Sequence, residues 1–249
     1  MKTHNPLWAE RLILLLMFAA LVIPLGCRDD AAYQTYQSRT GHRLSIKLQD
    51  GSVVILNSNS ILKVPQGDHK DRRKVILLGA AFFTVVPGSE LPFVVESADF
   101  KASTMGGSFF ARAYPHESGR QIEVTAGKLK VEKSYHSDTD NKAELLLPGE
   151  MVMLNRTVDL MEKETYPIAE RQSWLMGRLK FNNAGFPKVI EILEDWYGVP
   201  FEITEGMKLK HSFSADFRNE PLERVLKVFC LSAHCDFKLE DGKVILEAK

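Results

Sequence analysis

The chain has 249 residues, 45% of them hydrophobic and 26% charged, a balance typical of a globular protein with room for two ordinary domains. Lysine plus arginine and aspartate plus glutamate each number 32, so the formal net charge is zero, which argues against nucleic acid as a partner. The three cysteines are too few for a disulfide scaffold.

Residues 1–27 are predicted to be an export segment. Lys2 and Arg11 flank a short charged start, and no charged side chain interrupts the run from Leu12 to Cys27. This run is shorter than the roughly 20 residues that a spanning helix needs, and Pro24 interrupts its end. A signal peptide fits this pattern better than a membrane span.

The end of this segment, Leu25-Gly26-Cys27, resembles the cleavage site of a bacterial lipoprotein. The resemblance implies that Cys27 is lipidated and becomes the mature N-terminus, although Pro24 stands where such sites usually have Leu. Arg28-Asp29-Asp30 is similar to the acidic tract of surface-exported lipoproteins. The alternative is a single-pass anchor with an unmodified Cys27. Residues 28–42 are polar without periodicity, and we expect a tether between membrane and domain.

Residues 43–157 are expected to form an all-β domain. Leu44, Ile46 and Leu48 alternate with polar residues, which predicts a half-buried strand. Asp50-Gly51 then predicts a turn before a strand at 53–56.

Glycine and proline punctuate the rest of this region. Two strands, 75–78 and 82–86, are predicted on either side of Gly79, and a mobile polar loop is predicted at 134–141. One hairpin is expected around Gly127 and a last one around Pro148-Gly149. The further strands are expected at 92–96, 100–105, 109–114, 121–125, 128–132, 145–147 and 151–154.

Residues 158–173 are charged and irregular, so we expect a linker, and residues 174–249 differ in kind. Apolar residues at helical spacing from Phe186 to Tyr197 predict an amphipathic helix, which Gly198 ends. A second helix starts at Pro221. With strands at 179–181, 199–203, 211–217, 237–239 and 244–246, the order is β-α-β-β-α-β-β, a small α+β module.

Several motifs of the β region resemble the periplasmic FecR domain. They are Asp50-Gly51-Ser52-x-Val54-x-Leu56-Asn57, Arg73-x-Val75-x-Leu77-x-Gly79-x-Ala81-Phe82-Phe83-x-Val85, Gly106-x-Ser108-Phe109-x-x-Arg112-Ala113-Tyr114 and Leu146-x-Pro148-Gly149-Glu150. The family usually has Glu where this chain has Ala80. The C-terminal module resembles the domain that follows FecR domains in Bacteroidetes-type proteins, itself similar to the secretin/TonB short N-terminal domain. Its motifs are Trp174-x-x-Gly177-x-Leu179-x-Phe181, Trp196-Tyr197-Gly198-Val199 and Phe213-x-x-x-Phe217.

The resemblance implies a mainly β protein, with a solenoid-like or sandwich-like FecR domain followed by the α+β module. It also implies a cell-surface signalling regulator of the anti-sigma factor family, on the periplasmic side of a bacterial membrane. The implied partners are the signalling domain of a TonB-dependent transporter, met by edge-strand pairing, and an extracytoplasmic-function sigma factor, reached directly or through another subunit.

The short start of the chain suggests an alternative. Only Met1–Arg11 precedes the apolar run, and eleven residues are too few for a sigma-binding helical domain. The chain could instead be an outer-membrane or surface lipoprotein that uses the same folds as a scaffold for binding a protein or ligand.

No catalytic constellation is visible, so we expect neither an enzyme nor a metal or cofactor. Of the histidines only His234-Cys235 approaches metal-ligand spacing, and two further ligands are missing nearby. Cys230 and Cys235 could form a disulfide if the second helix ends near Ser232, the alternative being two buried thiols. Four aromatic residues are expected to pack in the core or line a groove: Phe82, Phe83, Phe109 and Phe110.

Overall fold

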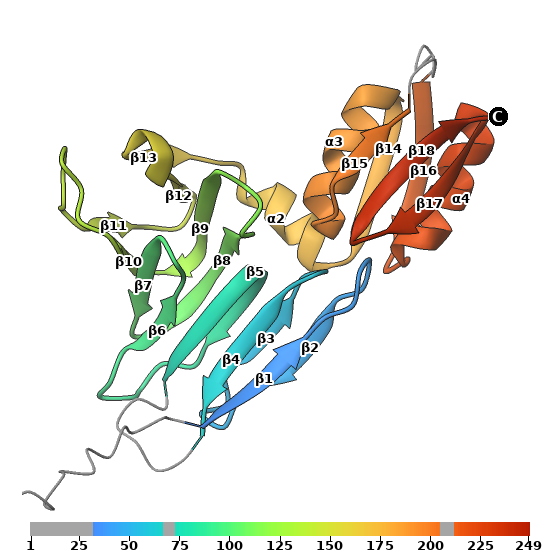
Figure 1. Cartoon of the computed structure of the whole chain (residues 1–249). Helices are drawn as coiled ribbons and strands as arrows, with labels where there is room; N and C mark the ends of the chain where they lie inside the picture. The colour runs from blue at the N-terminus through green and yellow to red at the C-terminus, as the bar shows by residue number, and fades with distance from the viewer. Residues whose placement is uncertain (1–31, 67–72, 205–211) are drawn as a thin grey trace, which may run out of the picture. The chain divides into compact units, whose positions relative to one another are not determined.

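The computed structural model describes residues 32–66, 73–204 and 212–249, coloured along the chain in Figure 1. Cys27 and the whole expected export segment lie outside the described residues. Within the described ranges, no helix combines the length and the apolar character that crossing a bilayer requires.

The strands from Tyr33 to Thr165 join one 13-stranded sheet, which we call the β-domain. Its main path runs β11-β10-β7-β6-β5-β8-β9-β12-β13, while β3 and β4 also pair with β5, β1 pairs with β4, and β2 pairs with β3. The strands are β1 (Tyr33–Gln37), β2 (Leu44–Lys47), β3 (Val53–Leu56), β4 (Ile61–Pro65), β5 (Lys74–Val85), β6 (Phe93–Glu96), β7 (Phe100–Thr104), β8 (Gly107–Ala113), β9 (Gly119–Gly127), β10 (Leu129–Lys133), β11 (Glu144–Leu146), β12 (Glu150–Asn155) and β13 (Leu160–Thr165).

Strand β5 is shared by two halves of this sheet. Its first part pairs with β4 and β6, and its second part pairs with β3 and β8. The change falls at Gly79, where φ is +102° and a Cβ atom would overlap Ser60. The two strands predicted around Gly79 are therefore one strand that bends, because glycine tolerates this backbone without a side chain in the way.

One hydrophobic core fills the space between the two halves. Leu62, Val75 and Phe93 enter it from one half, and Val54 and Ile122 enter it from the other. The arrangement is sandwich-like, one of the two alternatives expected, and the mainly β fold class with a small α+β domain is confirmed.

Both predicted hairpins of the β-domain are wrong in their pairing. β9 pairs with β8 and β12, while β10, which follows Gly127, pairs with β7 and β11. Likewise β11 pairs with β10, and β12, which follows Pro148-Gly149, pairs with β9 and β13. At both places the chain crosses from one half of the sheet to the other, which lets both halves cover the same core.

Three segments predicted to be irregular carry more order than expected. The described part of the expected tether contains β1. The expected linker begins at the end of the short 3₁₀ helix η1 (Arg156–Val158) and contains β13 and most of helix α2 (Ile168–Leu175). The polar loop 134–141 has no helix or strand, but it is held by Asp159. That carboxylate accepts hydrogen bonds from the Ser137 hydroxyl, at 2.8 Å, and from the backbone N–H of Thr139, at 3.2 Å.

The C-terminal domain, from Arg178 to Ala248, has the predicted β-α-β-β-α-β-β order. Its elements are β14 (Arg178–Gly185), α3 (Phe186–Tyr197), β15 (Phe201–Ile203), β16 (Ser212–Arg218), α4 (Leu222–Ala233), β17 (Cys235–Glu240) and β18 (Lys243–Ala248). β14 and β16 form a two-stranded sheet, and β15, β18 and β17 form a three-stranded one. The apolar stripes of α3 and α4 share one core with the inner faces of both sheets.

Candidate functional site

Helix α2 packs on the outer face of the β-domain, opposite its main core. Residues of one strand alternate between faces, so Phe83 and Phe109 stack at 4.9 Å within the main core, while Phe82 and Phe110 face outward. Trp174 of α2 covers them and meets the Phe110 ring edge-on, with centroids 5.5 Å apart. The four phenylalanines thus divide between a core and an interdomain cluster.

Arg43, just before β2, is enclosed by two tryptophans of the C-terminal half. Its guanidinium lies 3.9 Å from the Trp174 ring centroid and 4.9 Å from that of Trp196, and it donates a hydrogen bond of 2.7 Å to the Trp174 carbonyl. Its second terminal nitrogen is buried without a partner among the described residues. Burial lowers the pKa of Arg43 to about 10, so the side chain remains a cation at neutral pH, held by aromatic rings.

Arg171 of α2 forms a two-pronged ion pair with Glu123 of β9. Both nitrogen–oxygen distances are 2.8 Å, and only 3% of Glu123 is exposed. The same guanidinium lies 3.6 Å from the Phe110 ring centroid. A buried carboxylate needs such a partner, so this pair fixes α2 against the β-domain.

Arg112 of β8 links the β-domain to α3. It binds Glu117 through two hydrogen bonds of 2.9 and 2.7 Å, and a third nitrogen lies 3.3 Å from a carboxylate oxygen of Asp195. The hydrogen bonds and charge of Glu117 and the charge of Asp195 raise the pKa of Arg112 against the opposing effect of burial.

Tyr114 and Gly198 form a close contact between the two domains. The Tyr114 hydroxyl donates a 2.8 Å hydrogen bond to the carbonyl of Ser58 and accepts one of 3.3 Å from Asn57. Gly198 ends α3 with φ at +60°, and a Cβ atom there would overlap that hydroxyl. The glycine is therefore required both for the helix end, as predicted, and for this contact. We call the contacts of Arg43, Arg112, Tyr114 and Arg171 with their partners the joint.

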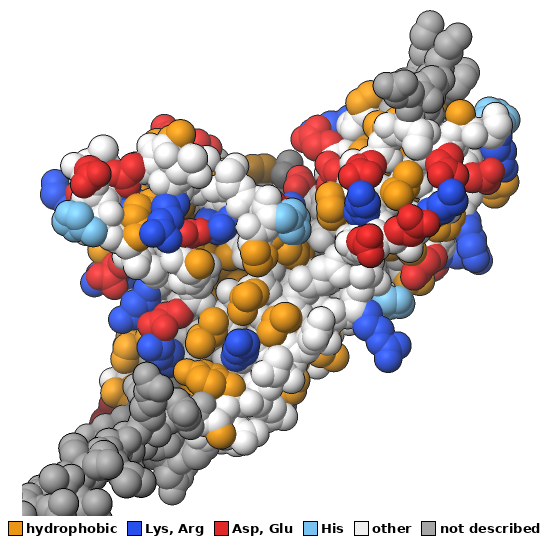
Figure 2. All heavy atoms as spheres, viewed as in Figure 1, with side chains coloured by type: hydrophobic (Ala, Val, Ile, Leu, Met, Phe, Trp, Pro, Cys, Tyr) orange, Lys and Arg blue, Asp and Glu red, His pale blue; other side chains and the backbone are white. Residues whose placement is uncertain are grey.

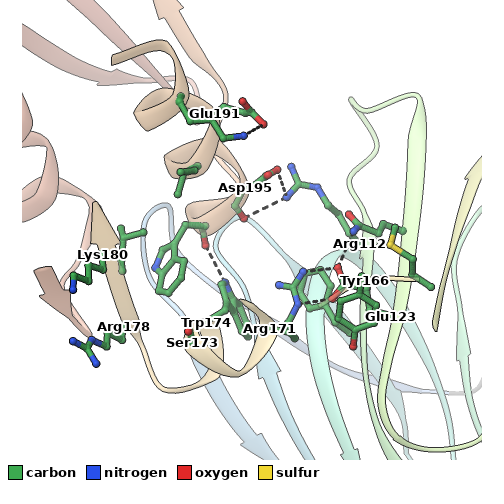
Figure 3. Close-up of a pocket in the computed structure, with 17 residues that line it drawn as sticks. Arg112, Glu123, Tyr166, Arg171, Ser173, Trp174, Arg178, Lys180, Glu191 and Asp195 are labelled. Carbon is green, nitrogen blue, oxygen red and sulfur yellow. Dashed lines mark hydrogen bonds and ion pairs between the residues drawn. The ribbon is translucent and has the colours of Figure 1, made fainter. Parts of the chain in front are cut away.

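A cleft of about 820 Å³ opens beside the joint (Figure 3). It takes residues from three parts of the chain: the β-domain and the segment after it, helix α2, and the C-terminal domain. Figure 3 shows Arg178 and Lys180 projecting from β14 on the side of the cleft away from the Arg171–Glu123 pair. The lining residues are Phe110, Arg112, Gln121, Glu123, Met151, Tyr166, Arg171, Ser173, Trp174, Arg178, Leu179, Lys180, Lys188, Glu191, Ile192, Asp195 and Trp196.

Most polar groups of the cleft are already engaged within the protein. The Tyr166 hydroxyl donates to the Val124 carbonyl at 2.9 Å, and burial raises its pKa. The Ser173 hydroxyl donates to the Ala169 carbonyl at 3.1 Å. Across the described ranges, no three His, Cys, Asp or Glu side chains are grouped as a metal site would need. The hydroxyls of Tyr166 and Ser173 therefore serve contacts within the protein.

The two cysteines singled out in the sequence come together. Helix α4 ends at Ala233, His234 has a positive φ, and the sulfurs of Cys230 and Cys235 lie 2.8 Å apart as buried free thiols. The helix thus ends between them, as a disulfide would require, and the disulfide itself stays a prediction. Cys27 lies outside the described residues.

Sequence reasoning missed the roles of Arg43 and Arg171. Arg112, Tyr114, Trp174 and Trp196 stood in the quoted motifs, but their meeting at one joint could not be inferred. The only available signal was that aromatic and arginine residues recur in motifs from both domains.

Two domain families match this chain in tandem. The family described as "FecR protein" matches residues 34–130, and the one described as "FecR, C-terminal" matches residues 178–246. No curated protein matches the chain. Fold and matches together define a two-domain protein of the FecR type, and the chain belongs to the FecR family.

Two crystal structures are similar to this chain, each described as a "putative anti-sigma factor" from Parabacteroides distasonis ATCC 8503. One has a TM-score of 0.62 and 26% sequence identity, with 88% of this chain and 100% of that chain covered. The other has a TM-score of 0.61 and 25% identity, with 87% and 99% covered. The similarity therefore spans both domains.

Proposed function

We propose that this FecR-family chain is a signalling regulator of the anti-sigma class. The observation that carries the proposal is the tandem of both FecR domains, in a fold shared over 88% and 87% of this chain with two structures each described as a "putative anti-sigma factor". A regulator of this class binds proteins and turns over no substrate. The cleft suits that role, because its polar groups hold the two domains together.

In the finer form of the proposal, the chain receives the signalling domain of a TonB-dependent transporter. Its response reaches an extracytoplasmic-function sigma factor, directly or through another subunit. Among the described residues, each sheet of the C-terminal domain ends in strands that pair on one side only, and such edges can accept a further strand. The contacts of the joint hold the C-terminal domain against the β-domain. In this proposal, they transmit the effect of a partner bound at one domain to the other.

The proposed location is the periplasmic side of a bacterial membrane, with the chain anchored at its N-terminal segment. Support comes from the apolar run ending at Cys27, which is typical of an export signal.

The test is capture of the full chain, extracted in detergent, by purified signalling domains of the TonB-dependent transporters of the same organism. We expect at least one domain to retain the chain, and deletion of the chain's gene to change transcription from one sigma-dependent promoter. Retention by none of the domains, with transcription unchanged, would refute the proposal.

A second candidate is a surface or outer-membrane lipoprotein that uses the folds as a binding scaffold, and Leu25-Gly26-Cys27 favours it. Intact-mass measurement of the membrane-extracted chain, with Cys27→Ala as the control, distinguishes the anchors. An acylated N-terminus at Cys27 means that any effect on transcription passes through another protein. Retention of Met1–Arg11 means that the chain itself reaches across the membrane.

A further inference from the structure

The outer face of the two-stranded sheet carries an excess of positive charge. Its exposed charged side chains are Arg178 and Lys180 on β14, and Asp216 and Arg218 on β16. In the strand register Arg178 lies directly opposite Arg218, an arrangement of like charges that weakens a sheet. We call these four residues the basic face.

The basic face has three cations and one carboxylate, that of Asp216. Arg178 lies 3.0 Å from Asp216, and this partner lowers the pKa of the carboxyl, with smaller effects from Lys180 and Arg218. Among the residues that the structure describes, Lys180 and Arg218 have no carboxylate partner.

The three-stranded sheet of the same domain behaves differently. Figure 2 shows acidic and basic side chains interspersed over β15, β17 and β18. There Lys238 pairs with Glu247 at 2.7 Å, Lys243 with Glu202 at 2.8 Å, and Lys249 with Asp236 at 3.5 Å. The charges of the three-stranded sheet are paired within the face, so solubility is enough to explain them. The basic face has a net positive charge that can attract an acidic partner.

The backbone edge of β14 opens into the cleft. Arg178, Leu179 and Lys180 are consecutive, and all three line the cleft. Side chains of consecutive strand residues point to opposite faces of the sheet, so a cleft on one face would be lined by alternate residues only. A cleft lined by three consecutive residues therefore lies at the edge of the strand. β14 pairs only with β16, which leaves the backbone groups of that edge free of a strand partner among the described residues.

The other charged side chains of the cleft each have a partner. Glu123 pairs with Arg171 and Glu191 with Lys188, while Asp195 shares Arg112 with Glu117. A strand that entered beside β14 would therefore meet its strongest attraction at Lys180, beside the Arg178–Asp216 pair, and that attraction favours carboxylates.

We propose that the edge of β14 in the cleft binds an extended acidic segment of a partner protein as an added strand, with its carboxylates against Lys180 and the basic face. The inference rests on the proposed function, since it assigns the surface and the chemistry by which the signalling domain docks. The added strand satisfies the open backbone edge, and its carboxylates relieve the repulsion between Arg178 and Arg218.

The first test uses the full chain in detergent and three short synthetic peptides. One alternates glutamate with threonine, one has lysine in place of every glutamate, and one is the acidic peptide with alternate backbone nitrogens methylated. Trp174 and Trp196 line the cleft, so tryptophan fluorescence reports occupancy. We expect the acidic peptide to bind most tightly, more weakly as salt rises, and the methylated peptide to lose affinity because it cannot complete the strand.

Lys180→Glu is the decisive variant, and Lys227→Glu on the exposed side of α4 is its charge-matched control. We expect Lys180→Glu to weaken the acidic peptide roughly fivefold to tenfold and Lys227→Glu to leave its affinity unchanged. Circular dichroism of both variants checks that each is folded. Equal binding of the acidic and basic peptides, or equal loss in both variants, would overturn the inference.

The same variants are then compared in capture by the transporter signalling domain. If the wild-type chain and Lys180→Glu are captured equally, the proposed function stands and this docking surface is wrong. If no signalling domain is captured and transcription is unchanged, but the acidic peptide binds selectively, the proposed function fails and the surface stands.

Discussion

The joint and the basic face use arginine in opposite ways. Arg43 in the joint lies between two tryptophans, and Arg171 is paired with a buried carboxylate. Arg178 and Arg218 on the basic face are exposed and stand opposite each other. A buried arginine has lost its hydration, so other groups of the protein must stabilise its charge. Water hydrates an exposed arginine, so its charge is stable without a protein partner and stays accessible to another molecule.

This difference predicts where substitutions affect folding and where they affect binding. Changes at the joint should lower the free energy of unfolding or loosen the two domains. Changes at the basic face should leave stability nearly constant and alter affinity.

The largest expected effect is that of Trp174→Ala. The ring is 3% exposed and covers Arg43, Arg171 and Phe110 together, so its removal leaves a cavity and uncovers two cations. We expect the free energy of unfolding of the variant, measured by urea denaturation, to be about 3–5 kcal/mol lower than that of the wild type. Met176→Ala is the control, because that side chain is 73% exposed and its loss should cost little. Equal effects of the two changes would mean that the joint contributes nothing to stability.

Glu123→Gln should come next, with a loss of about 3 kcal/mol, because Arg171 is left without its charged partner in a buried site. Its control is Glu132→Gln, which breaks the exposed Lys130–Glu132 pair, 2.8 Å long, in the same domain. That loss should stay below about 1 kcal/mol. The comparison is made by thermal unfolding. A loss at Glu132 as large as that at Glu123 would show that burial does not decide the strength of these pairs.

Gly198→Ala should cost about 2 kcal/mol, since it combines a positive φ with an overlap on the Tyr114 hydroxyl. Gly88→Ala, with φ at +95° and no atom within 4 Å of the new Cβ, measures the cost of a positive φ without an overlap. Tyr114→Phe removes the overlapping hydroxyl and should restore part of the stability of Gly198→Ala. Because ring atom Cζ would still lie 2.5 Å from the new Cβ, the contact is judged by a double-mutant cycle: if the losses of the two single variants simply add, the contact between the domains is not what makes the glycine necessary.

A smaller effect is expected at Cys230 and Cys235, away from both regions. Burial raises the pKa of both thiols, so iodoacetamide should label them slowly in the folded chain and quickly in urea. The folded state holds these protons more tightly than the unfolded one. The pair's stabilising contribution is therefore complete below about pH 8.5, the ordinary thiol pKa, and is lost as the pH rises above it. Cys230→Ser should flatten this pH dependence in thermal unfolding; an unchanged profile would contradict the assignment.

The same pair tests the predicted disulfide. A diamide oxidant should join the two sulfurs, with both thiol hydrogens transferred to the diamide, and the product should lose two hydrogens in its intact mass. A mass unchanged after exposure to the oxidant, with both thiols still alkylated in urea, would rule out the disulfide.

The order of the elements in the C-terminal domain could be predicted from its residues, although the parallel pairing of β15 with β18 could not. The apolar stripe from Phe186 to Tyr197 and the glycine that ends that helix are local signals. Each of them acts within a few residues of the chain, so sequence reasoning reaches it.

The β-domain was predictable only at the level of strands. Its strand positions follow from alternation, but Gly127 and Pro148-Gly149 indicated hairpins where the chain crosses between the halves of the sheet. Turn residues predict that the chain changes direction, but they do not predict which strand the following segment pairs with. That choice depends on which pairing lets both halves cover the same core.

The sequence by itself therefore determined the fold class, the family and the end of α3 at Gly198, because these depend on local periodicity and short motifs. Only the tertiary structure decided the pairing of the β-domain strands and the meeting of Arg43 with Trp174 and Trp196. It also decided the opening of the β14 edge into the cleft. These contacts join residues far apart in the chain, and they form because burying the common core and matching each buried charge leaves few arrangements of low free energy.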